Sequence, residues 1–311
     1  MAGYAHVSPF IFSLLQTVYT GFIQYYLKAV FCIMSIIVSK AWVLARMYEP
    51  DVTIVDCRFE MGQPDAGRKA YEEEHIPGAV YLDLEQDLSS PIREHGGRHP
   101  LPDPKQFSQT LAKLGITPQT RVIAYDDQGG MNASRLWWLL SYLGHEQAHV
   151  MNEGFTAWKN AHYPVTADQP IRVPASYTYS LRPEMLASMD EVRSASGNSE
   201  IIVIDSRDPR RYQGLEETMD KAAGHIPGAK NKFWKLLVEQ DGKWIPSDRL
   251  AEHYKEFPAD QEIIVYCGSG VSACPNFIGL KEAGYEKIKL YAGSWSDWIS
   301  YPENPIATGE E

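Results

Sequence analysis

The stretch HIPGA at residues 75–79 occurs a second time at residues 225–229. Two further pairs of segments repeat around it in the same order: IVDCR (54–58) with VIDSR (203–207), and VIAY (122–125) with IIVY (263–266). Later in each half, Gly144 corresponds to Gly284 and Trp158 to Trp298. Several landmarks that keep one order with slowly changing spacing indicate an internal duplication. The chain therefore contains one structural unit twice.

Each copy reads as short β-branched strands that alternate with amphipathic helices. The runs TIVD (53–56) and EIIVY (262–266) are typical of strands covered on both faces. The stretch PKQFSQTLAKLG (104–115) has a helical period and ends at Gly115, a common helix C-terminal signal. This alternation predicts an α/β fold in which each copy is a mainly parallel sheet flanked by helices.

The duplication also predicts the domain boundaries. We expect an N-terminal domain over residues 34–164 and a C-terminal domain over residues 181–311, joined by a linker at 165–180 that is rich in Pro, Ala, Ser and Thr. Residues 1–33 match neither copy. They are apolar but contain several polar residues, so we interpret them either as a start-site artefact or dispensable extension, or as a membrane anchor. They lack the features of a secretory signal.

The charge balance and the cysteine content bear on the partners and the cellular compartment of the protein. The chain has 311 residues, with 29 Lys and Arg against 40 Asp and Glu, and a net charge of −11. This acidic balance, without a local basic patch, argues against nucleic acid as a partner. Four cysteines fit a reducing compartment, so we expect a cytoplasmic protein unless residues 1–33 anchor it to a membrane. The spacing of Cys and His residues indicates no metal site.

The second copy places a cysteine at the end of a buried strand. The strand at 262–266 is followed by the loop Cys267, Gly268, Ser269, Gly270, Val271, Ser272 and Ala273. Two glycines allow the backbone to curl so that successive N–H groups face the sulfur, and the helix that follows adds its positive end. Both features favour a thiolate nucleophile. A packing cysteine is the alternative, but a Gly-x-Gly loop after a buried strand fits anion binding better.

The first copy differs at the same position. Its strand 122–125 is followed by Asp126, where the second copy has Cys267. An acidic residue at this position would repel an anion. We therefore predict that the C-terminal copy is catalytic and that the N-terminal copy is inactive.

The combined motifs resemble one known family. The tandem HIPGA motifs, GGRHPLP (96–102), the pair Trp137-Trp138 and the Cys267 loop are similar to the two-domain rhodanese family of sulfurtransferases over residues 36–308. The resemblance implies a duplicated α/β fold with the site between the halves. It also implies that Cys267 takes a sulfur atom from a small-molecule donor as a persulfide and passes it to a thiol, cyanide or thioredoxin, without a cofactor.

The residues after the cysteine bear on the donor. Thiosulfate-type members tend to carry basic residues there, whereas Gly268 and Ser269 resemble the 3-mercaptopyruvate type. In that type a serine joins a histidine and an aspartate of the first domain in a proton relay. The resemblance thus implies a relay of Ser269, His75 and Asp65. His75 has a second interpretation, because the repeat at His225 suggests that both histidines stabilise a turn.

For the donor's carboxylate, the resemblance points to Arg211, since a guanidinium pairs with a carboxylate through two hydrogen bonds. The second arginine of the animal enzymes is missing from LEETMDK (215–221), which leaves Lys221 as the nearest candidate. Arg207 has a counterpart in Arg58 of the other copy, so we expect a structural role for it.

Three other functions remain open at this stage. The first is a thiosulfate:cyanide sulfurtransferase, and the second is a non-catalytic rhodanese-like binding module. The third is a cysteine phosphatase, which needs an arginine about six residues after the nucleophile to hold the phosphoryl group. Ala273 stands at that position, which argues against the phosphatase.

Overall fold

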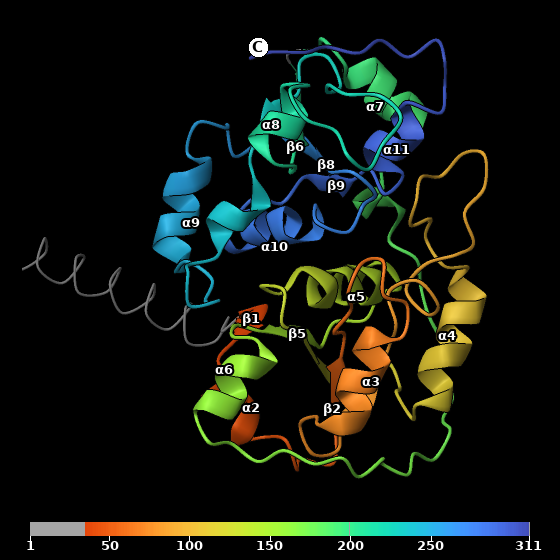
Figure 1. Cartoon of the computed structure of the whole chain (residues 1–311), viewed down its shortest axis with the longest axis vertical. Helices are drawn as coiled ribbons and strands as arrows, with labels where there is room; N and C mark the ends of the chain where they lie inside the picture. The colour runs from red at the N-terminus through yellow and green to blue at the C-terminus, as the bar shows by residue number, and fades with distance from the viewer. Residues whose placement is uncertain (1–34, 199, 311) are drawn as a thin grey trace, which may run out of the picture. The chain divides into compact units, whose positions relative to one another are not determined.

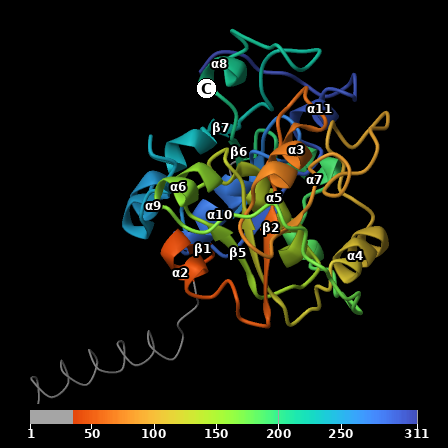
Figure 2. The ribbon, with the colours of Figure 1, turned by 60° about the horizontal axis from the view of Figure 1, so that its bottom comes forward.

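The computed structural model describes residues 35–198 and 200–310, which form two α/β halves (Figures 1 and 2). The N-terminal extension predicted over residues 1–33 lies outside the described residues. Within the described part of the chain, every helix is too short or too polar to cross a membrane.

The predicted alternation of strands and helices is confirmed in both halves. The first half consists of β1 (Ile37–Val38), α2 (Lys40–Leu44), β2 (Val52–Asp56), α3 (Ala66–Glu73), β3 (Val80–Tyr81), α4 (Pro104–Lys113), β4 (Arg121–Tyr125), α5 (Met131–Tyr142), β5 (Ala148–Met151) and α6 (Phe155–Asn160). The predicted signal at the end of α4 is present, because Gly115 follows this helix with φ +74°.

The second half follows after residues 165–180, which carry no helix or strand. It consists of η1 (Pro183–Met185), α7 (Met189–Ala195), β6 (Ile201–Asp205), α8 (Pro209–Tyr212), β7 (Lys230–Asn231), η2 (Trp234–Leu237), α9 (Ser247–Tyr254), β8 (Glu262–Tyr266), α10 (Cys274–Glu282), β9 (Ile288–Leu290) and α11 (Ser294–Trp298).

Each half has one parallel sheet with the same central pair of strands. The order is β1-β5-β4-β2-β3 in the first half and β7-β6-β8-β9 in the second. In register, Asp56 of β2 pairs with Tyr125 of β4, and Asp205 of β6 pairs with Tyr266 of β8. The residue that follows each of these tyrosines lies at the carboxyl edge of its sheet. This edge is where open parallel sheets form their binding sites.

Both sheets are buried on both faces, which explains their continuous apolar sequences. Successive residues along one strand enter different cores, because strand side chains alternate between faces. In β2, Ile54 packs into the outer core of the first half, whereas Val55 packs into a second core. In β8, Ile264 packs into the outer core of the second half, whereas Val265 enters that same second core.

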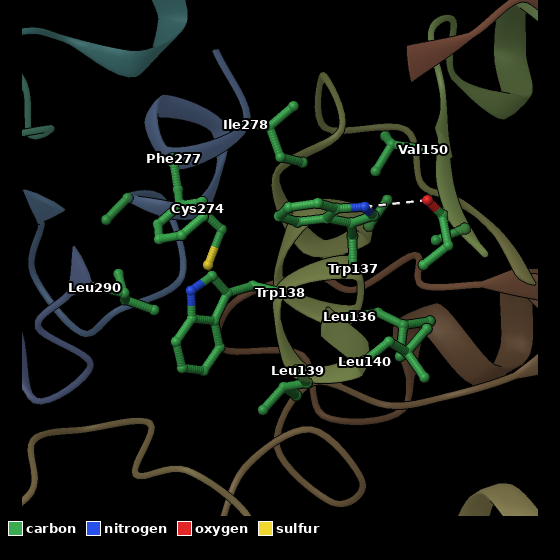
Figure 3. Packing of buried hydrophobic residues seen from close by; sticks show 14 of the residues in the cluster. Leu136, Trp137, Trp138, Leu139, Leu140, Val150, Cys274, Phe277, Ile278 and Leu290 are labelled. Carbon is green, nitrogen blue, oxygen red and sulfur yellow. Dashed lines mark hydrogen bonds between the residues drawn. The ribbon is translucent and has the colours of Figure 1, made fainter. Parts of the chain in front are cut away.

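The second core is therefore shared by the two halves. Helices α5 and α10 pack against each other within it. Figure 3 shows Trp137 and Trp138 of α5 beside Phe277 and Cys274 of α10. The ring centroids of Trp138 and Phe277 lie 6.5 Å apart in an edge-to-face arrangement, a geometry that aromatic pairs favour. The paired tryptophans thus join the halves into one packed body.

We expect the two halves to unfold together. Replacing Phe277 with Ala should lower the free energy of unfolding by about 3–5 kcal/mol, because the fully buried ring leaves a cavity in the shared core. Urea denaturation monitored by far-UV circular dichroism and by tryptophan fluorescence should give one coincident transition. Ile171→Ala is the control, since Ile171 is 96% exposed. Two separate transitions in the unmodified protein would contradict a shared core.

Candidate active site

The loop of residues 267–273, called the Cys267 loop below, leaves the carboxyl end of β8. Cys267 is 1% exposed. The loop is fixed to the start of α11, because the N–H of Trp295 donates to the carbonyl of Cys267 at 2.9 Å and the N–H of Ser296 to that of Gly268 at 3.0 Å. These bonds hold Cys267 at the carboxyl edge of the sheet.

Gly270 gives the loop its curvature. Its φ is +76°, and a Cβ at this position would lie 2.2 Å from the carbonyl oxygen of Ala292, so only glycine fits. The tight turn points the N–H of Gly270 at the Sγ of Cys267, with a distance of 3.2 Å. The hydroxyl of Ser294 lies 4.0 Å from the same sulfur. The predicted orientation of backbone N–H groups toward the sulfur is therefore present at Gly270.

The equivalent loop of the first half shows what this backbone geometry binds. The carboxylate of Asp126 accepts four backbone N–H groups, at distances of 2.8 to 2.9 Å, from Gln128, Gly130, Asn132 and Ala133. The first half therefore supplies an anion of its own to the loop.

In the second half, the counterparts of three of these donors are Ser269, Val271 and Ala273. Their N–H groups have no acceptor among the described residues. The side chain of Cys267 is shorter than that of Asp126, and among the backbone N–H groups of the described residues only that of Gly270 donates to its sulfur. The loop thus leaves backbone donors for an anionic group attached to Cys267.

Cys274 begins α10 beneath this loop. Burial raises the pKa of its thiol to about 12, and the thiol donates to the carbonyl of Gly270 at 3.4 Å. Cys274 therefore remains a thiol that supports the loop backbone.

Ser269 contacts a histidine from the other half of the chain. Its hydroxyl lies 2.8 Å from the Nδ1 of His99, which is 6% exposed. Burial, assisted by the guanidinium groups of Arg135 and Arg98, lowers the pKa of His99 to about 4. The imidazole is thus neutral at pH 7 and can exchange a proton with the serine. Among the described residues, no carboxylate forms a hydrogen bond with His99.

This contact corrects the predicted relay, because the structure does not bring His75 to Ser269. The ring of His75 stacks on Tyr71 with centroids 4.1 Å apart, and its Nδ1 lies 2.7 Å from the Tyr71 carbonyl. Its backbone pairs with Thr166 of the linker. His225 stacks on Tyr212 in the same way, with centroids 3.8 Å apart, so both histidines hold a turn.

Asp65 does not reach the site either. It is exposed at the start of α3 and does not line the cavity beside the Cys267 loop. Sequence reasoning missed His99, although it lies within the GGRHPLP stretch that helped to identify the family resemblance.

Arg135 of α5 connects the parts of the site that come from different halves. Its fully buried guanidinium donates to the carbonyls of Gly270 at 3.1 Å, His99 at 3.0 Å and Leu88 at 3.4 Å. No carboxylate of the described residues pairs with it. A single cation therefore fixes the distance between the Cys267 loop and the segment that carries His99.

A cavity of about 660 Å³ opens beside the Cys267 loop. One wall is apolar and is formed by side chains of both halves: Phe59, Met61, Leu84, Met131, Trp234 and Val238. The polar part contains Ser269, Ser272, His99 and two arginines, Arg98 and Arg211. The cavity therefore places the nucleophile's loop next to cationic groups and an apolar surface.

The two arginines lie against the residue that follows the nucleophile. A Cβ on Gly268 would be 3.0 Å from the guanidinium of Arg98 and 3.6 Å from that of Arg211. Arg211 thus lies where a donor's carboxylate is expected. Lys221 is exposed and does not line the cavity, whereas Arg98 and Arg211 both do.

Arg207 has the structural contacts expected of it. Its guanidinium pairs with Asp205 at 2.6 Å, as Arg58 pairs with Asp56 at 2.7 Å in the first half. In the described residues, no cluster of three or more His, Cys, Asp or Glu side chains is arranged to hold a metal ion.

Comparison with known proteins adds independent information. The sequence matches the family described as Rhodanese-like domain over residues 39–161 and 188–301. It is 38% identical over 272 residues to a probable 3-mercaptopyruvate sulfurtransferase of Pseudomonas aeruginosa, covering 86% of this chain and 95% of the relative. It is 33% identical to a putative thiosulfate sulfurtransferase of Mycobacterium tuberculosis, covering 83% of this chain and 91% of that protein.

A solved structure gives the same result for the fold. The structure of Escherichia coli SseA, described among 3-mercaptopyruvate sulfotransferases, superposes with a TM-score of 0.73 at 30% identity. The match covers 85% of this chain and all of that one. The predicted duplicated α/β fold is therefore confirmed by likeness as well as by the topology of its sheets.

The environment of His99 leads to a prediction for its titration. Its NMR Cε1–H resonance, identified by its loss in His99→Gln, should titrate with a midpoint near pH 4, below the ordinary value of 6.5. Because the unfolded chain takes up this proton first, the free energy of unfolding should fall as the pH decreases from 6.5 to 4. The His99→Gln variant should lack that part of the decrease. A midpoint near 6.5 would contradict the buried, neutral imidazole.

Proposed function

Because the chain belongs to the rhodanese-like domain family, we propose that it is a sulfurtransferase with 3-mercaptopyruvate as the donor. In this proposal Cys267 carries the sulfur as a persulfide and hands it to a thiophilic acceptor. The acceptor is cyanide, a small thiol or a protein thiol such as that of thioredoxin. The observation that carries the proposal is the loop of backbone donors around Cys267.

The first half supports this interpretation of the loop. Asp126 fills its own loop with a carboxylate that takes N–H groups from Gly130 and Asn132. The corresponding groups of Val271 and Ala273 have no such acceptor among the described residues. A persulfide adds one sulfur atom to Cys267 and carries a negative charge, so its outer sulfur extends toward these donors. The loop then stabilises the intermediate rather than the free thiol.

The same comparison supports different roles for the two copies. An intramolecular carboxylate occupies the loop of residues 126–130, so we propose that the N-terminal domain (34–164) is inactive and positions His99. The C-terminal domain (181–311) is catalytic, and residues 165–180 link the two. The free thiols of Cys57, Cys267 and Cys274 fit a cytoplasmic protein.

Sulfur transfer from mercaptopyruvate needs one proton movement. The Cys267 thiolate attacks the donor's sulfur, the carbon–sulfur bond breaks, and its electron pair remains on carbon as the enolate of pyruvate. The proton originally on the donor's sulfur ends on that carbon, which leaves a Cys267 persulfide and pyruvate. We propose that Ser269 and His99 move this proton, because their 2.8 Å contact lies in the cavity beside the nucleophile.

Thiosulfate makes a different demand on the site. Attack on its outer sulfur breaks a sulfur–sulfur bond and releases sulfite, which leaves with the electron pair and needs no proton at carbon. Ser269 and His99 are therefore needed for proton transfer in the reaction with mercaptopyruvate, but not in the reaction with thiosulfate. This difference separates the proposed donor from the alternative one.

We expect Ser269→Ala and His99→Gln to lower kcat/KM for mercaptopyruvate by about 100-fold, the lower range for loss of a general acid–base. The rate with thiosulfate should change by less than about threefold, because no proton transfer is lost. Cys267→Ser should abolish turnover with both donors. Steady-state release of pyruvate and of sulfite measures the two reactions.

A second Ser–His pair in the chain supplies the matched control. The hydroxyl of Ser300 lies 2.8 Å from the Nδ1 of His95, and this pair also joins the two halves but is outside the cavity. Ser300→Ala should leave both reactions unchanged. Equal losses with both donors in Ser269→Ala would contradict the proton-transfer role, and turnover in Cys267→Ser would contradict the persulfide.

A further inference from the structure

The two guanidinium groups beside Gly268 already hold a carboxylate of the protein. The side chain of Asp220 accepts from the Nη2 of Arg211 at 3.0 Å and forms an ion pair with Arg98 as well. Arg98 comes from the first half and Arg211 from the second. Although the surrounding residues are exposed, the Asp220 side chain is only 3% exposed. One buried carboxylate thus bridges the two cations next to the nucleophile.

Asp220 belongs to a segment with no helix or strand, residues 215–223. Leu215 and Met219 of this segment are 65% and 39% exposed, so most of it faces solvent. It begins after Gly214 and ends before Gly224, which have φ values of +77° and +117°. Met219 lines the cavity, and the acidic side chains of Glu217 and Asp220 connect the segment to Arg211 in the cavity wall.

A second acidic residue of the segment has a different role. Glu217 pairs with Arg211 at 2.8 Å and also accepts the backbone N–H groups of Met219 and Asp220. Burial opposes ionisation, but the Met219 N–H and Arg211 outweigh it and keep the pKa of Glu217 below its ordinary value. Glu217 is thus bound to the backbone of its own segment and to Arg211, whereas among the described residues the Asp220 side chain contacts the two guanidinium groups alone.

The ion pairs that include Asp220 form a chain whose own charges are balanced. Asp205, Glu217 and Asp220 alternate with Arg207, Arg211 and Arg98 in one chain of ion pairs. If Asp220 leaves, this chain of ion pairs is left with one uncompensated positive charge. A monocarboxylate restores the balance, whereas a dianion such as thiosulfate brings one negative charge in excess.

We propose that Asp220 occupies the position of the donor's carboxylate and thereby selects a monoanionic α-keto acid over dianionic thiosulfate. The incoming carboxylate replaces the Asp220 carboxylate on Arg98 and Arg211, so that one negative charge is exchanged for another. Donor binding therefore includes the cost of releasing Asp220. This inference rests on the proposed sulfur transfer for its choice of donor, but the exchange of carboxylates is a binding event that can be measured without it.

The experiment compares two substitutions that each remove one negative charge from the same segment. Asp220→Asn removes the bridging carboxylate. Glu216→Gln is the control, because Glu216 pairs with Arg210 outside the cavity and both side chains are more than half exposed. Both changes are made in the full chain carrying Cys267→Ser, and pyruvate binding is measured by isothermal titration calorimetry.

Asp220→Asn should tighten pyruvate binding about tenfold, because the ligand no longer displaces a charge-assisted partner. Glu216→Gln should leave the affinity within about twofold. With Cys267 present, Asp220→Asn should raise the ratio of kcat/KM for thiosulfate to that for mercaptopyruvate. Asp220→Ser serves as a second variant if thermal denaturation shows that Asp220→Asn is unfolded.

Unchanged or weaker pyruvate binding in folded Asp220 variants would overturn the inference and would mean that the ion pairs are structural. An equal gain in Glu216→Gln would also overturn it, since net charge alone would explain the effect. If pyruvate binding tightens but none of the proteins transfers sulfur, the exchange of carboxylates stands and the proposed function fails. If the protein transfers sulfur but the Asp220 variants bind pyruvate no more tightly, the proposed function stands and the exchange of carboxylates fails.

Discussion

The site depends on a buried cation, the guanidinium of Arg135. It lies on α5 of one half and donates to the backbone carbonyls of Gly270 and His99, so it connects the Cys267 loop to the residue that we propose for proton transfer. Its charge also interacts with the sulfur groups of Cys274 and Cys267. A buried charge without a carboxylate partner is costly, and here an anionic sulfur intermediate at the adjacent loop would offset part of that cost. The shared core around α5 and α10 then keeps the cation in place.

The duplicated fold provides an internal comparison that a single domain cannot. Both halves end their central strand in a curled loop at the carboxyl edge of a parallel sheet. In the first half that loop surrounds the carboxylate of Asp126, and in the second it surrounds the shorter side chain of Cys267. One backbone geometry therefore stabilises a fixed anion in one copy and, in our proposal, a transient one in the other. The first copy supplies His99, Arg98 and part of the cavity wall.

The structural features that the sequence predicted correctly are those that depend on neighbouring residues or on the internal repeat. The strands 53–56 and 262–266, the helix ending before Gly115 and the nucleophile's loop follow from periodicity and from glycine positions within a few residues. The relay histidine did not follow in this way. His75 and His99 both come from the first half. His75 stacks on Tyr71, four residues earlier in the chain, whereas only tertiary packing places His99 beside Ser269. The contact of Asp220 with the two arginines could not be predicted from the sequence either, because acidic residues in a loop usually face solvent.

The most direct measurement is the intact mass of the protein after brief exposure to each donor, with the Cys267→Ser variant treated in parallel. We expect a gain of one sulfur atom from mercaptopyruvate, which is lost on adding cyanide or a thiol and is absent in the variant. Thiosulfate should load the protein less readily. Loading from thiosulfate alone would contradict the choice of donor. No gain from either donor, or the same gain in the variant, would contradict the central claim that the loop exists to hold a persulfide on Cys267.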